Sequence, residues 1–174
     1  MLGAGANLSA FEHNQLYLNI EGTEFINASF ASGSDIDSDS RSVIPADFDK
    51  DGATDLLIAS VGGGPLRLFR NQIPIGRNTR VRLELAGSKS NRLGIGARVI
   101  FHCGGRQIVR DLFPANGFAG QASDDWLIGL GSSLRIDRMS VRWPSGKTQN
   151  YVNLPVNCGI RLYEEHLNYE TSDL

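Results

Sequence analysis

The chain has 174 residues, with 41% hydrophobic and 21% charged residues, which is the composition of a globular protein of one ordinary domain or two small ones. Lys and Arg total 17 against 19 Asp and Glu, giving a formal net charge of -2. No basic stripe could neutralise a row of phosphates, which argues against nucleic acid as a partner. No apolar run approaches the roughly 20 residues of a transmembrane helix, so we expect no membrane insertion.

Glycine is abundant in the chain, with 20 residues, and these lie between short stretches of β-branched or aromatic residues. This pattern is typical of strands joined by turns. It predicts an all-β fold, in which no helix of three turns is expected. Residues 4–14 are helix-permissive but have no apolar stripe, which favours coil or a short turn.

The first part of the chain predicts about four short strands, the content of one propeller-type blade. Leu16, Leu18 and Ile20 alternate with polar residues, so one face of the first strand should be buried. The expected elements are strands over 15–20 and 24–30 around a turn at 22–23, a polar stretch over 31–42, an acidic loop over 47–55, a strand over 56–59, a turn over 62–65 and a strand over 66–69.

A break falls near residues 71–78, where Pro74 and Gly76 interrupt the strand pattern. We therefore expect a blade over residues 1–73 and a second domain over residues 74–174. Short strands separated by glycine-rich turns predict an antiparallel β-sandwich there. The expected strands cover 81–85, 97–102, 107–113, 126–128, 138–143, 148–152 and 159–164.

The acidic loop carries the sharpest chemical signal in the sequence. It reads D-x-D-x-D-G-x-x-D, with Asp47, Asp49, Asp51 and Asp55 at positions 1, 3, 5 and 9. A hard cation such as Ca²⁺ takes about six or seven oxygens, and alternating side chains of a curled loop can supply them, together with the backbone carbonyl of Ala53 at position 7. Gly52, at the sharp turn, should have a positive φ.

Four carboxylates within nine residues repel one another, each close pair by roughly 1–4 kcal/mol at about 4 Å. We therefore expect the loop to open without a cation and the metal to add stability. The loop is not an EF-hand, because position 12 is Ile58 within an expected strand rather than a bidentate Glu. An Asp-rich turn with solvated carboxylates remains the alternative, and it is the favoured interpretation of a second acidic run at residues 35–39, which lacks the glycine.

Residues 46–58 (ADFDKDGATDLLI) resemble the calcium loop of FG-GAP/VCBS propeller repeats, including the integrin α-subunit type. The resemblance implies that Asp47, Asp49, Asp51, Asp55 and the carbonyl of Ala53 bind Ca²⁺ in a structural role. Residues 13–19 and 66–71 also resemble a terminal blade of this kind, whereas residues 39–42 (DSRS) are glycine-poor compared with the family pattern.

Three further stretches resemble the ASPIC/UnbV domain, which commonly follows such repeats in proteins like cartilage acidic protein 1. They are residues 90–99 (SNRLGIGARV), 126–131 (WLIGLG) and 141–147 (VRWPSGK). With the strands between them they cover about residues 71–165.

Two weaker candidate binding features lie in the second domain. Asn91, Arg92 and Arg98 flank a glycine-rich turn and could bind an anion or a carboxylate, although a turn-stabilising network, with the arginines pairing to acids such as Asp111 or Asp137, is favoured. Aromatic residues could form a sugar-stacking platform, although a place in the sandwich core is favoured for most of them. These residues are Phe113, Phe118, Trp126, Trp143 and Tyr151, of which Phe118 is the best candidate for exposure.

No catalytic motif is recognisable, so we expect no enzyme activity. The histidines His13, His102 and His166 stand in no known catalytic pattern. Cys103 and Cys158 form no C-x-x-C, which leaves one disulfide or two thiols open.

The expected function is that of a calcium-stabilised, non-catalytic binding or scaffolding module of a larger exported protein, acting in adhesion or protein–protein interaction. The alternative is a carbohydrate-binding appendage of a larger enzyme. The partner would be a protein or glycan, and the location extracellular, cell-surface or periplasmic, as the resemblance implies. The first six residues lack the features of a secretion signal, so an exported parent would make this chain a piece of it.

Overall fold

A computed structural model describes residues 13–20, 22–60, 64–115, 117–118 and 120–174. Within them the chain forms 13 strands and one helical turn. Most of the expected coil over 4–14, and part of the expected turn over 62–65, lie outside the described residues. None of the described helices is long and apolar enough to cross a membrane.

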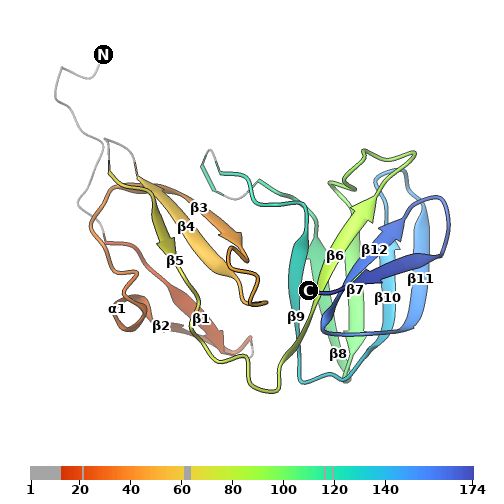
Figure 1. The fold of residues 1–174 in the computed structure, drawn as a ribbon, viewed down its shortest axis with the longest axis horizontal. Coiled ribbons are helices and arrows are strands. Elements are labelled where there is room, and N and C mark those ends of the chain that lie inside the picture. Colours follow the sequence, from red (N-terminus) through yellow and green to blue (C-terminus); the bar gives the residue numbers. More distant parts are fainter. Residues whose placement is uncertain (1–12, 21, 61–63, 116, 119) are drawn as a thin grey trace, which may run out of the picture.

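The first five strands form a hairpin and a separate three-stranded sheet (Figure 1). The hairpin pairs β1 (Tyr17–Ile20) with β2 (Glu24–Asn27). The sheet has the order β3-β4-β5, with β3 at Ser40–Ala46, β4 at Asp55–Ser60 and β5 at Arg67–Phe69. The strand content therefore exceeds the four expected, and it is divided between two sheets; its assignment to a propeller blade stays a prediction.

Two local differences from the expected elements have clear causes. The strand expected over 24–30 ends at Asn27, whose side-chain oxygen accepts hydrogen bonds from the Ser29 backbone (2.9 Å) and hydroxyl (2.6 Å). The one-turn helix α1 (Ser29–Ser32) follows and ends at Gly33 with φ of 70°. Strand β3 was not expected because its first residues are polar; its Pro45 is tolerated since β3 is an edge strand.

The remaining eight strands form two four-stranded sheets packed face to face. One has the order β11-β10-β7-β8 and the other β13-β12-β6-β9. Their bounds are β6 Thr79–Ala86, β7 Arg98–Cys103, β8 Arg106–Asp111, β9 Trp126–Gly131, β10 Ile136–Arg142, β11 Thr148–Leu154, β12 Cys158–Tyr163 and β13 Tyr169–Ser172.

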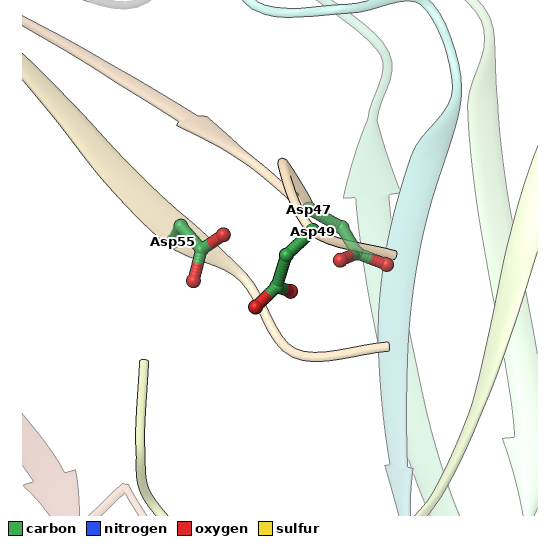
Figure 2. A group of neighbouring side chains, drawn as sticks. All are labelled: Asp47, Asp49 and Asp55. Carbon is green, nitrogen blue, oxygen red and sulfur yellow. The ribbon is translucent and has the colours of Figure 1, made fainter. Parts of the chain in front are cut away.

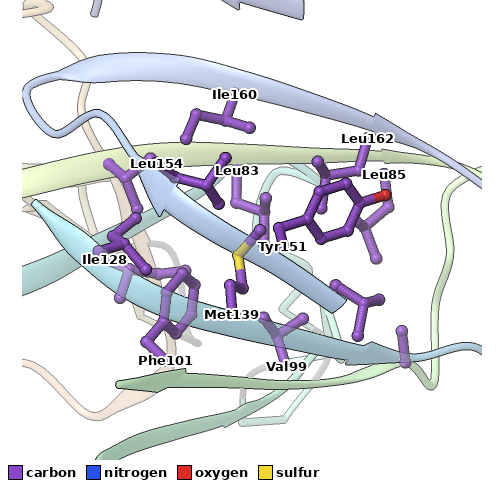
Figure 3. Packing of buried hydrophobic residues seen from close by; sticks show 14 of the residues in the cluster. Leu83, Leu85, Val99, Phe101, Ile128, Met139, Tyr151, Leu154, Ile160 and Leu162 are labelled. Carbon is purple, nitrogen blue, oxygen red and sulfur yellow. The ribbon is translucent and has the colours of Figure 1, made fainter. Parts of the chain in front are cut away.

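The core lies between these two sheets (Figure 3). Leu83 of β6 and Leu162 of β12 are fully buried on one side, and Phe101 of β7 and Met139 of β10 on the other. Apolar residues alternate with polar ones along β6, as the sequence predicted. The all-β class and the antiparallel β-sandwich are confirmed, although β12 pairs with β6 in parallel.

The sequence predicted the burial of the aromatic residues only in part, and it left the state of the two cysteines open. Trp143 and Tyr151 are buried and Phe118 is 71% exposed, as expected. Phe113 is 55% exposed, so its expected place in the core was wrong: it follows the last residue of β8 in the loop toward β9. Both Cys103 and Cys158 are free thiols.

Candidate metal centre

The acidic loop closes the turn between β3 and β4. Ala46 at the end of β3 pairs with Asp55 at the start of β4, so the residues that follow Ala46 must reverse direction within a short span. Lys50 and Gly52 take the left-handed conformation, with φ of 59° and 83°, and this confirms the positive φ expected for Gly52. The reversal places Asp47 next to Asp55 although they are eight positions apart.

Asp47, Asp49 and Asp55 bring their carboxylates together (Figure 2). Each offers one oxygen, and these oxygens lie within 4.8 Å of one another. The Asp51 carboxylate is not part of this group; its Oδ1 accepts a hydrogen bond from the Ala53 N–H at 2.8 Å. The structure thus gathers three of the four acidic ligands that the sequence predicted.

Asp47 is the most distinctive of the three. Its side chain is only 4% exposed. Its Oδ2 accepts hydrogen bonds from the Gly52 N–H and from Arg82, both at 3.0 Å. Its Oδ1 is buried and has no hydrogen-bond partner among the described residues. A buried carboxylate oxygen without a partner is costly unless a cation or a donor reaches it.

Asp49 and Asp55 are held by neighbouring groups. Asp55 is 1% exposed, and its two oxygens accept the backbone N–H groups of Phe48 (3.1 Å) and Asn71 (2.8 Å). Asp49 is more exposed; it accepts the Asp51 N–H at 3.3 Å and pairs with Arg70 at 3.2 Å. Each carboxylate oxygen has a second lone pair, so these bonds leave room for a cation.

Three arginines, which the sequence reasoning missed as parts of this site, surround the loop. Arg70 follows β5 and pairs with Asp49. Arg80 and Arg82 belong to β6 of the sandwich; Arg80 donates to the Asp51 carbonyl at 3.1 Å, and Arg82 pairs with Asp47. The sequence did indicate that Arg80 and Arg82 lie on the polar face of an alternating strand. It could not indicate that this face contacts the acidic loop.

The donor set fits a hard cation such as Ca²⁺. Its members are carboxylate oxygens, which Ca²⁺ and Mg²⁺ prefer. The loop brings them together at a left-handed glycine, and one buried oxygen of Asp47 has no donor in the part of the chain that the structure describes. Asp47, Asp49 and Asp55 would hold the ion directly, and its charge would offset the repulsion among them.

The second acidic run forms no comparable group in the part of the chain that the structure describes. Asp35 pairs with His13 at 2.8 Å, and Asp39 pairs with Arg41 at 2.6 Å. The cluster at the β3–β4 loop is the one group of three or more potential metal ligands found among the described residues. This agrees with the interpretation of residues 35–39 as an ordinary polar loop.

The turn at residues 91–98 has local partners for two of its three candidate binding residues. The Asn91 side-chain amide donates to the Ile95 carbonyl (2.7 Å), and its oxygen accepts the Ile95 N–H (2.8 Å). Arg98 makes two hydrogen bonds to Asp111, at 2.6 and 2.8 Å, and this pairing lowers the pKa of the Asp111 carboxyl. The turn-stabilising interpretation accounts for these contacts. Arg92 is exposed and lines an open cleft.

Glu164, which the sequence reasoning did not single out, is the most buried acid of the sandwich, at 1% exposed. Its carboxylate accepts the backbone N–H groups of Ser88, Lys89 and Ser90 at 2.7–2.8 Å, and the hydroxyls of Ser90 and Ser145. Burial raises its pKa, but the hydrogen bonds outweigh burial and bring the pKa to about 2. Glu164 is therefore a structural anchor that joins three loops.

The fold and the acidic loop together define an all-β protein with a β-sandwich and a candidate structural metal loop. Residues 87–168 match the family model described as ASPIC and UnbV. No curated protein matches the chain. The matched residues leave out β6, which lies between β12 and β9 and thus inside the sheet. The sandwich is therefore larger than the matched segment.

Proposed function

We propose that this chain is a calcium-stabilised, non-catalytic binding or scaffolding module of a longer exported protein, acting in adhesion or protein–protein interaction. The Ca²⁺ ligands would be Asp47, Asp49, Asp51, the carbonyl of Ala53 and Asp55, as in the FG-GAP/VCBS repeats that the loop resembles. The ASPIC/UnbV domain then follows the last blade of a propeller. The partner is a protein or a glycan bound on surface loops.

One observation carries the metal half of this proposal. Three carboxylate oxygens lie within 4.8 Å of one another, and the buried Oδ1 of Asp47 has no donor among the described residues. Oxygens in this arrangement are mutually repulsive without a cation and well placed to share one. Asp51 lies outside this group, so its side chain would have to move to join them.

Thermal unfolding with calcium and with chelator tests the metal site. Ligand binding to the folded state adds about 2.7 kcal/mol at a hundredfold excess over Kd, which raises Tm by several degrees for a chain of this size. We expect this gain for the wild type and little or none for Asp49→Ala. Asp49 is the suitable position because its side chain is partly exposed, so its loss leaves the fold intact.

The matched control is Asp173→Ala, which removes an exposed carboxylate far along the chain from the loop. It should keep the full calcium response. Equal melting temperatures of the wild type in calcium and in chelator would overturn the proposal, as would an unaltered calcium response in Asp49→Ala.

Exposed aromatic residues support the alternative of a carbohydrate-binding appendage. Phe118 is 71% and Phe113 is 55% exposed, and both lie in the loop between β8 and β9. Exposed aromatic rings are the usual platform for sugar rings. Under this alternative, glycan-array binding appears for the wild type and is lost in Phe118→Ala, whereas capture of a protein ligand without any glycan signal contradicts it.

A further inference from the structure

Arg82 and Asp47 form the most buried ion pair at the acidic loop. Their side chains are 16% and 4% exposed, against 60% and 33% for the pair of Arg70 and Asp49. Arg82 also approaches Asp125 at 3.5 Å. Because Arg82 belongs to β6, this charge comes from the sandwich rather than from the sheet that carries the loop.

The two oxygens of Asp47 have different surroundings. Oδ2 is fixed by Arg82 and by the Gly52 N–H, whereas Oδ1 is buried without a partner among the described residues. Arg82 therefore partly neutralises the Asp47 carboxylate. It binds Oδ2, so Oδ1 remains free to bind a cation. A positive charge placed there stabilises the neighbouring acids in the same sense as a bound cation does, and it repels that cation.

We propose that Arg82 is the built-in counter-charge of the metal-free loop: it holds Asp47 in place when no cation is bound and lowers the affinity of the loop for Ca²⁺. The second half of this statement rests on the proposed calcium site. It implies that, contrary to the sequence-based expectation of a loop that opens without a cation, the site stays folded when calcium is scarce and fills only at higher calcium concentrations.

Substitution of Arg82 should separate the two effects. In Arg82→Gln the buried Asp47 carboxylate keeps its charge beside Asp49 and Asp55 but loses its ion-pair partner, so the protein in chelator should melt at a lower temperature. The same repulsion makes a cation more valuable, so calorimetric titration should show Ca²⁺ binding about three- to tenfold more tightly than in the wild type.

Conservative and control variants separate charge from mere structure. Arg82→Lys keeps the charge but loses the guanidinium fork, so its calcium affinity should stay near that of the wild type. Arg70→Gln removes the more exposed ion pair, so it should change the melting temperature in chelator and the calcium affinity less than Arg82→Gln does. Arg135→Gln, which removes an exposed pair with Asp137 in the sandwich, should leave the calcium affinity unchanged.

Calcium affinity that is equal or weaker in Arg82→Gln than in the wild type overturns the inference. If neither protein binds calcium, the proposed calcium site is refuted. The role of Arg82 in the metal-free loop is then tested by the melting temperatures in chelator alone. Adding Asp47→Asn to Arg82→Gln removes the unpaired charge. Recovery of the melting temperature in this double variant supports the counter-charge role, and no recovery refutes it.

Discussion

At the scale of single residues, Glu164 shows how one buried acid can organise several loops. Its carboxylate accepts three successive backbone N–H groups from residues 88–90 and the hydroxyls of Ser90 and Ser145. The segment 145–147 is held further by Lys147, which donates to the Glu164 carbonyl. These segments overlap two of the stretches that resemble the ASPIC/UnbV domain, residues 90–99 and 141–147, so the acid links these two stretches.

Replacing Glu164 by Gln should strongly destabilise the sandwich at neutral pH. The amide group of Gln is a donor and would face backbone donors, so at least one buried group loses its partner, at a cost of about 1–3 kcal/mol or more. Urea unfolding at pH 7 measures this difference. The matched control is Glu165→Gln, at the exposed neighbouring position, which should change stability by less than about 0.5 kcal/mol.

The pH dependence of the same variant has a definite sign. The folded-state pKa of Glu164, about 2, lies below the ordinary value of 4.5, so its contribution is fully present above about pH 4.5 and is lost as the pH falls toward 2. The stability difference between wild type and Glu164→Gln should therefore shrink between pH 4.5 and 2. A difference that stays constant over this range would show that the carboxylate charge is not what holds the loops.

At the scale of secondary-structure elements, the sequence predicted best where periodicity and burial agree. Strand β6 alternates buried Val81, Leu83 and Leu85 with polar residues, and it lies where it was expected. Strand β3 was missed because its first three residues are polar and the strand, which lies at the edge of its sheet, shows no apolar alternation there. Strand β13 was missed because all four of its residues are exposed, so it has no apolar pattern.

The candidate metal loop was predicted by local spacing, but its surroundings could not be. The positions of Asp47, Asp49 and Asp55 follow from the sequence of one curled turn, and the structure gathers all three. The contacts from Arg80 and Arg82 join residues about 30 positions apart and depend on how β6 faces the loop. These long-range contacts depend on tertiary packing, which short-range sequence patterns do not encode. The same holds for the parallel pairing of β12 with β6.

At the scale of the whole molecule, buried apolar residues are unevenly distributed. The continuous core belongs to β6–β12, whereas among the described residues that precede β6 only Ala53 and Ile58 are buried apolar residues. Several large side chains of that part are exposed, including Phe25 at 67% and Leu66 at 63%. Burial of apolar surface is the main source of folding stability. The first part of the chain should therefore have a much smaller free energy of unfolding of its own than the sandwich.

This imbalance predicts that the two parts open separately, and that calcium affects only one. Amide hydrogen exchange followed by mass spectrometry should show fast exchange in β3–β5 and slow exchange in β6, β7, β10 and β12. If the loop holds calcium, the ion links β3 to β4, so calcium should slow exchange in those strands and leave the sandwich unchanged. Uniform exchange across both parts would instead mean that the contacts of Arg80 and Arg82 with the loop join them into one cooperative unit.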